Sequence, residues 1–102
     1  MKLEHIRWQS QQDPGEITLR LQLESEGFDV SLWRDPSDRV YEPHTHENDA
    51  SLWVLRGCIV FHIGEKEYPL GPGDRLMLPG GMVHTAEAGP EGATYLIGQR
   101  RS

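Results

Sequence analysis

The chain has 102 residues with 11 Gly and 7 Pro, a length that suits one domain and a composition typical of turn-rich β proteins. Its net charge of -6 argues against nucleic acid as a partner, because nucleic-acid binding needs a basic surface that replaces condensed counterions. The single cysteine excludes an intramolecular disulfide, and no apolar run in residues 1–15 suits a signal peptide or membrane span, so we expect a cytoplasmic protein without a membrane partner.

The first element that the sequence predicts with defined ends is a helix over residues 14–26. Asp13 can cap this helix, Pro14 suits its first turn, and Glu16, three residues after the cap, completes a capping box. Gly27 follows at a position where helices commonly end in a left-handed residue. Apolar residues in this segment also alternate as they would in a strand, but the start and stop signals outweigh that pattern.

The rest of the chain predicts about eight short strands, because segments of alternating β-forming residues are separated by turns of Gly, Pro and Asp. The predicted strands cover residues 28–34, 40–46, 51–55, 58–63, 67–70, 75–78, 82–87 and 93–97. Arg56 and Gly57 are expected to form a tight reversal, and residues 89–92 a turn. Many short strands with such turns favour a barrel or sandwich over an open sheet.

Three histidines in two of these strands form a candidate metal site. Side chains alternate between the faces of a strand, so His44 and His46 are expected to point the same way, and His84 can complete one face of a site. Imidazole ligands suit several divalent metals, and the identity of the ion stays open among Zn, Fe, Ni and Mn. A dry or polar pocket whose histidines bind no metal is the alternative interpretation.

Around His84 the sequence resembles the second motif of the cupins, which are small jelly-roll barrels. That motif reads G-x5-P-x-G-x2-H-x3-N, and its conserved positions are matched here at the required spacings by Gly73, Pro79, Gly81 and His84. Ala88 stands where the terminal Asn would be.

Around the first two histidines the sequence resembles the first cupin motif, G-x5-H-x-H-x3/4-E-x6-G. His44, His46 and Gly57 match it, whereas Asp38 replaces the opening Gly and Ala50 replaces the Glu. In the four-ligand cupin site that Glu coordinates the metal, so the resemblance implies a site with three histidines and no acidic ligand at this position.

The resemblance also implies the fold and the domain organisation. We expect an all-β cupin jelly-roll (double-stranded β-helix) barrel with one short N-terminal helix. Residues 1–102 would form a single cupin domain, in which residues 1–34 are an N-terminal extension containing the helix and a strand, and residues 38–88 carry the two motifs.

For function, the resemblance implies one divalent metal ion held in the barrel by His44, His46 and His84. Without an acidic ligand the site would keep open coordination positions and a positive charge that favours a small anionic metabolite. The chain would then be a metal-dependent enzyme of the oxygenase, isomerase or hydrolase type; the alternative is a non-catalytic cupin that binds or senses a small molecule or metal. Glu47 or Asp49 could replace the missing Glu, although charged loop residues more often face water.

One strand bears on assembly. If Ala50 lies on the inner face of the barrel, Leu52 and Val54 also point inward, whereas Trp53 and Leu55 point outward. An outward Trp and Leu must be covered by another sheet, by the helix or by a second subunit. Because small cupins commonly dimerise, we expect a homodimer.

Overall fold

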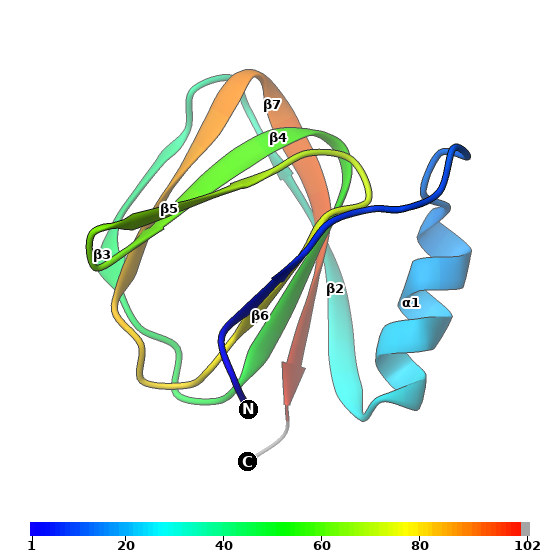
Figure 1. The fold of residues 1–102 in the computed structure, drawn as a ribbon, viewed down its shortest axis with the longest axis horizontal. Coiled ribbons are helices and arrows are strands. Elements are labelled where there is room, and N and C mark those ends of the chain that lie inside the picture. The colour runs from blue at the N-terminus through cyan, green and yellow to red at the C-terminus, as the bar shows by residue number, and fades with distance from the viewer. Residues whose placement is uncertain (101–102) are drawn as a thin grey trace.

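The computed structural model describes residues 1–100, in which a single antiparallel sheet of seven strands rolls into a barrel with one helix outside it (Figure 1). The elements in chain order are β1 (Glu4–Ile6), α1 (Glu16–Ser25), β2 (Phe28–Asp35), β3 (Val40–His44), β4 (Ala50–Ile63), β5 (Lys66–Leu70), β6 (Arg75–Leu78) and β7 (His84–Arg100). The strand order is β1-β6-β4-β7-β2, and in addition β3 pairs with β7 and β5 with β4. No helix in the described residues is long and apolar enough to span a membrane.

Two long strands, β4 and β7, organise the barrel by pairing with each other and curving together (Figure 1). β7 pairs with β3 near its start, where His84 lies opposite His44, and with β2 over its second half. β4 likewise pairs with β6 near its start and with β5 near its end. Each long strand thus has two different outer neighbours, and the curved pair closes the sheet on itself. This architecture confirms the predicted all-β jelly-roll barrel with a short N-terminal helix.

The sequence predicts an interruption in each long strand, and both predictions are wrong. Gly57, expected in a tight reversal, has a φ of 73° and lies inside β4, beside register shifts in its pairing with β7. Gly92, expected in a turn, has a φ of 76° and lies inside β7. A Cβ atom at Gly57 would come within 2.2 Å of the Gly92 carbonyl oxygen. Glycines at these positions bend a paired strand, as a β-bulge does, without ending it.

The predicted helix forms, but it starts later than expected and without the expected cap. α1 begins at Glu16, and its N-cap is Gly15, which has no side-chain capping bond, so the capping box from Asp13 is wrong. Glu16 instead pairs with Arg20 one turn along the helix, at 3.3 Å. At the other end, Gly27 has a φ of 91°, as the sequence predicts for the residue that stops the helix.

The helix covers the outer face of the sheet. Inside the barrel, Ala50, Leu52 and Val54 belong to the larger core cluster, as the alternation of the strand predicts. A second core lies between α1 and the sheet, and its buried members are Leu19, Leu23, Phe28, Leu55 and Leu96. The helix therefore covers Leu55 within one chain, so this face needs no second subunit to bury that side chain. The homodimer stays a prediction.

We expect Leu23→Ala to lower the free energy of unfolding by about 2–5 kcal/mol, because it leaves a cavity in the core between helix and sheet. Leu23 is fully buried in that core. Leu21→Ala is the matched control at dilutions that keep the protein monomeric, since Leu21 is 60% exposed on the same helix within one chain and its truncation should change the stability of the monomer by less than about 0.5 kcal/mol. Denaturant titration of both variants measures the difference, and equal losses would contradict this assignment of the helix faces.

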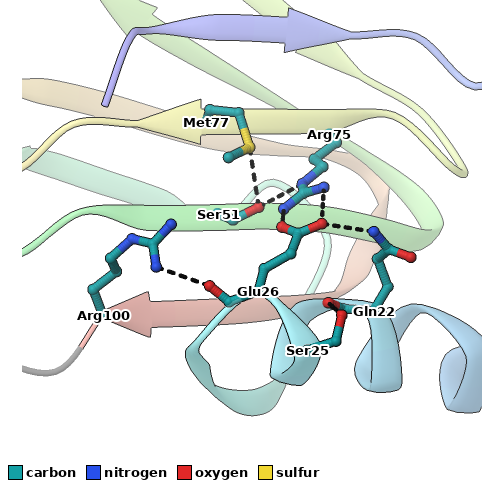
Figure 2. A network of polar contacts seen from close by, with 7 residues as sticks. All are labelled: Gln22, Ser25, Glu26, Ser51, Arg75, Met77 and Arg100. Carbon is teal, nitrogen blue, oxygen red and sulfur yellow. Dashed lines mark hydrogen bonds and ion pairs between the residues drawn. The ribbon is translucent and has the colours of Figure 1, made fainter.

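A polar network fastens the end of the helix to the barrel (Figure 2). The Arg75 guanidinium donates two hydrogen bonds to the Glu26 carboxylate and one, of 2.7 Å, to Ser51 Oγ. It also lies over the Trp53 ring, 4.5 Å from the ring centroid. Arg100 donates a 2.8 Å hydrogen bond to the Glu26 carbonyl oxygen. Arg75 is only 7% exposed, so this network replaces the water that its charge has lost.

Candidate metal centre

The three candidate histidines come from two segments that meet at one end of the barrel. His44 is the last residue of β3, and His84, its register partner, is the first residue of β7. His46 lies beyond the end of β3, so the predicted strand over residues 40–46 is two residues too long. Strand alternation therefore does not orient His46, and contacts of its loop must do so.

Two glycines of the second histidine segment hold that loop in place. The Gly81 N–H donates a 2.8 Å hydrogen bond to the His46 carbonyl oxygen, and the Gly80 N–H donates one of 2.9 Å to Asp49 Oδ1. A Cβ atom at Gly80 would lie 2.7 Å from the Glu47 carbonyl oxygen, closer than a side chain tolerates. The glycines therefore allow the two segments to approach until their histidines share one site.

The imidazole rings converge. Their centroids are 4.3 Å apart for His44 and His84, and 5.1 Å apart for His46 and each of the other two. One potential ligand nitrogen from each ring lies within 4.8 Å of the others. Three nitrogen donors at this spacing surround a volume that one cation could fill after small ring rotations.

Backbone carbonyl groups fix the orientation of two rings. His44 Nδ1 lies 2.7 Å from the Glu42 carbonyl oxygen, and His84 Nδ1 lies 2.9 Å from the Met82 carbonyl oxygen. A carbonyl oxygen only accepts, so each Nδ1 carries the hydrogen and, in a neutral ring, the Nε2 lone pair remains free. Metal-binding histidines commonly have this arrangement, in which the second nitrogen donates to a backbone or carboxylate oxygen.

His84 provides the clearest test of whether these residues fit a metal ion. Its side chain is only 2% exposed, and its Nε2 has no hydrogen-bond partner among residues 1–100. A buried polar atom without a partner costs about 1–3 kcal/mol, so folded proteins rarely keep one without a reason. A cation bound between the three rings would supply the missing partner, so the donor set fits a divalent metal.

The electrostatics of the site favour the neutral form of two of these histidines. Burial lowers the pKa of His46, and the neighbouring rings of His84 and His44 lower it further. Burial also lowers the pKa of His84, against the opposing effect of its hydrogen bond to the Met82 carbonyl oxygen. Both imidazoles are therefore uncharged near neutral pH, which is the form that binds a metal.

Neither loop carboxylate joins the histidines. Asp49 accepts the hydrogen bond from Gly80, and Glu47 is exposed. Among the described residues, the group of potential metal ligands contains the three histidines alone. Ala50 is fully buried in the barrel core and offers no ligand atom.

A cavity of about 190 Å³ opens beside the histidines. Its wall is mainly apolar side chains of β4 and β7, including Phe61, joined by Gln99 and three further aromatic residues, Trp33, Tyr41 and Tyr95. The volume lies below the range of about 300–1,000 Å³ that is typical of drug-sized ligands, so the cavity suits a small molecule.

Sequence reasoning did not place these aromatic residues in the site. A tryptophan is by its type more often a core or interface residue, yet Trp33 is exposed and lines the cavity. Tyr41 lies three positions before His44, so regular alternation would put the two side chains on opposite faces. A register shift between Tyr41 and His44 brings both into the cavity, and no local pattern in the sequence signals it.

Comparison with known proteins gives a family and a set of related folds. A family model described as "Cupin domain" matches residues 32–97. No curated protein matches the chain.

Several solved structures have a similar fold. A cupin superfamily protein from Desulfitobacterium hafniense is 16% identical with a TM-score of 0.64, and the match covers 98% of this chain and 79% of that one. KdgF from Halomonas sp. is 23% identical with a TM-score of 0.59, covering 72% of this chain and 69% of that one. The DMSP lyase DddQ from Ruegeria pomeroyi is 24% identical with a TM-score of 0.66, covering 72% of this chain but only 38% of that one. At these identities the similarity shows the fold alone.

Proposed function

Because the chain belongs to the cupin domain family, we propose that it binds one divalent metal ion through His44, His46 and His84 and acts on a small anionic metabolite. The observation that carries this proposal is the convergence of three imidazoles on one point, with the buried Nε2 of His84 lacking any other partner in residues 1–100. Zinc, iron and nickel suit imidazole ligands, and manganese is the further candidate.

The metal would supply a positive charge and open coordination positions, since three neutral imidazoles neither compensate a divalent cation nor complete its coordination. No Lys or Arg side chain of the described chain lines the cavity, so an anionic group on the ligand would be balanced at the histidines. The apolar wall of β4 and β7 would exclude water from the remainder of a small ligand. These features support a metabolite with one anionic end.

The reaction proposed is metal-dependent turnover of the oxygenase, isomerase or hydrolase type. One structurally similar protein is named a lyase, so lyase chemistry belongs in the same screen. The test is metal analysis of the purified protein, followed by oxygen-consumption, isomerisation, hydrolysis and elimination assays on small carboxylates. We expect about one metal ion per chain in the wild type and a loss of both metal and turnover in His46→Ala. Wild-type protein that takes up no divalent metal would refute the proposal.

A second candidate function, a non-catalytic module that binds or senses a small molecule, is favoured by one feature of the cavity. Its wall in residues 1–100 contains no free carboxylate or amine, and both tyrosine hydroxyls are hydrogen-bonded to Asp35. Proton-transfer chemistry usually needs a free acid or base beyond the metal ligands. Metal binding without turnover across the screen would select this second function.

We also propose that the chain forms a homodimer. The sheet face that first suggested a partner is covered by α1, but two large apolar side chains of that helix, Ile17 and Leu21, remain exposed. Sedimentation at micromolar concentration tests the assembly, and a monomer alone would contradict it.

A further inference from the structure

Three residues from different strands form a hydrogen-bonded cluster beside the cavity. Asp35 ends β2, Tyr41 lies in β3 and Tyr95 lies in β7. The Tyr41 hydroxyl donates a 2.5 Å hydrogen bond to Asp35 Oδ1, and the Tyr95 hydroxyl donates one of 2.7 Å to Asp35 Oδ2. Both tyrosines line the cavity together with the three histidines, whereas the buried Asp35 does not, so the carboxylate lies behind the phenols.

The cluster fixes where the phenol hydrogens point. A carboxylate only accepts, so both hydroxyl hydrogens are directed to Asp35 and away from the cavity. A phenol ionises only well above neutral pH, so both hydroxyl groups keep their hydrogen there. Their remaining lone pairs accept hydrogen bonds, so this part of the cavity wall accepts and does not donate.

A neutral donor on the ligand suits this part of the cavity better than an ammonium. The Arg39 guanidinium lies over the Tyr41 ring, 4.6 Å from its centroid, and would repel a ligand ammonium near that phenol. An ammonium would also lose its hydration in a largely apolar cavity without touching the carboxylate of Asp35. A hydroxyl group meets the phenol oxygens without either penalty.

We infer that Asp35, Tyr41 and Tyr95 select a small hydroxy acid over the corresponding keto acid. The ligand hydroxyl would donate to a phenol oxygen, while its carboxylate lies toward the three histidines. A keto group offers only an acceptor and would face oxygen lone pairs. The carboxylate end of this inference rests on the proposed function, whereas the hydroxyl preference rests on the hydrogen bonds of Asp35 alone. Asp35 is a positioning residue, since it acts through the tyrosines.

The experiment compares γ-hydroxypentanoate with γ-oxopentanoate, which share a carbon skeleton and differ in the group that would meet the tyrosines. Isothermal titration calorimetry of the zinc-loaded protein should show about tenfold tighter binding of the hydroxy acid, the scale of one hydrogen bond made or lost. Equal affinities, tighter binding of the keto acid, or no binding of either acid would overturn the inference.

Two variants test whether the preference comes from the hydrogen bonds of Asp35 or only from the polarity of the cavity wall. In Asp35→Asn, the amide N–H donates to one phenol oxygen, so that phenol can turn its hydrogen into the cavity and donate to the ketone. The preference should then fall to about threefold or less. Tyr41→Phe should reduce it as well, whereas the control Tyr68→Phe, on β5 outside the cavity, should keep it. An unchanged preference in Asp35→Asn, with its circular dichroism spectrum and melting temperature close to wild type, would overturn the inference.

The same titrations distinguish this inference from the proposed function. Zinc content is measured for every variant, and both acids are also titrated into protein treated with a chelator. A protein that binds none of zinc, iron, nickel and manganese but still prefers the hydroxy acid would refute the metal proposal and support the selection by Asp35. Full zinc binding without any preference for the hydroxy acid would support the metal proposal and refute the selection by Asp35.

Discussion

Replacing His84 by leucine is expected to abolish stabilisation by metal while changing the free energy of unfolding of the metal-free protein by less than about 1 kcal/mol. The variant removes a buried Nε2 that has no partner in residues 1–100, which costs about 1–3 kcal/mol, and also the hydrogen bond to Met82, which contributes about 0.5–1.5 kcal/mol. These two effects nearly cancel. A histidine kept for stability alone would instead be costly to replace.

The metal-bound protein should respond very differently. Loss of a direct ligand is expected to weaken metal affinity by more than the roughly 10–100-fold typical of residues that only support a ligand. At a free metal concentration of about 100 times its dissociation constant, the wild type gains about 2.7 kcal/mol. A variant with about 100-fold weaker affinity gains only about 0.4 kcal/mol under the same conditions.

The matched control for this experiment is His62→Leu. His62 lies on β4, where its Nδ1 is 3.8 Å from Glu67 Oε1, and it is not part of the histidine cluster. This variant should keep the full metal-dependent shift in melting temperature. If His84→Leu kept that shift too, or lost several kcal/mol without metal, the assignment of His84 as a metal ligand would be wrong.

The second large effect is expected for Arg75→Met, which should lower the free energy of unfolding by about 3 kcal/mol. Removing Arg75 takes away the counter-ion of the Glu26 carboxylate, which keeps the hydrogen bond from Gln22 Nε2, and also removes one hydrogen bond to Ser51 Oγ (Figure 2). Glu26 is partly exposed and can regain some water, so the loss lies at the lower end of the range for buried pairs. Denaturant titration measures it.

Two further variants test whether the loss comes from the unpaired partner. Combining Arg75→Met with Glu26→Gln should recover most of the stability, because the remaining group is then uncharged. Arg20→Met removes the more exposed pair with Glu16 and should cost less than about 1 kcal/mol. Equal losses in Arg75→Met and Arg20→Met would show that burial of the network is unimportant.

The same network predicts a pH dependence. The hydrogen bond from Arg75 lowers the pKa of Glu26 below its ordinary 4.5, against the opposing effect of burial. Folded Glu26 therefore binds a proton less readily than unfolded Glu26, so its contribution to stability is present above that ordinary pKa and is lost as the pH falls through the lowered value. Between about pH 5 and pH 3 the wild type should lose more stability than Arg75→Met. Parallel pH profiles of the two proteins would contradict this linkage.

The sequence determined the fold and the histidine set through two motifs whose internal spacing is short and resembles that of the cupins. The motif residue Gly57 lies where the chain approaches another backbone closely, and Gly27 ends the helix in the conformation that glycine adopts readily. The spacing of His44, His46 and His84 identified the three rings that the structure brings together. The glycines and the spacings within each motif are local features, so they are visible in the sequence.

The tertiary structure alone decided which other residues surround the histidines. A register shift places Tyr41 in the cavity, and pairing between β2 and β7 brings Asp35 beside Tyr95, 60 positions away. The sequence suggests that strands end near Gly57 and Gly92. Each strand instead bends there and continues, because it pairs with neighbouring strands on both sides of the bend. Alternation along a strand is a local property, whereas register, bulges and the coverage of a sheet face depend on the strand or helix that lies opposite.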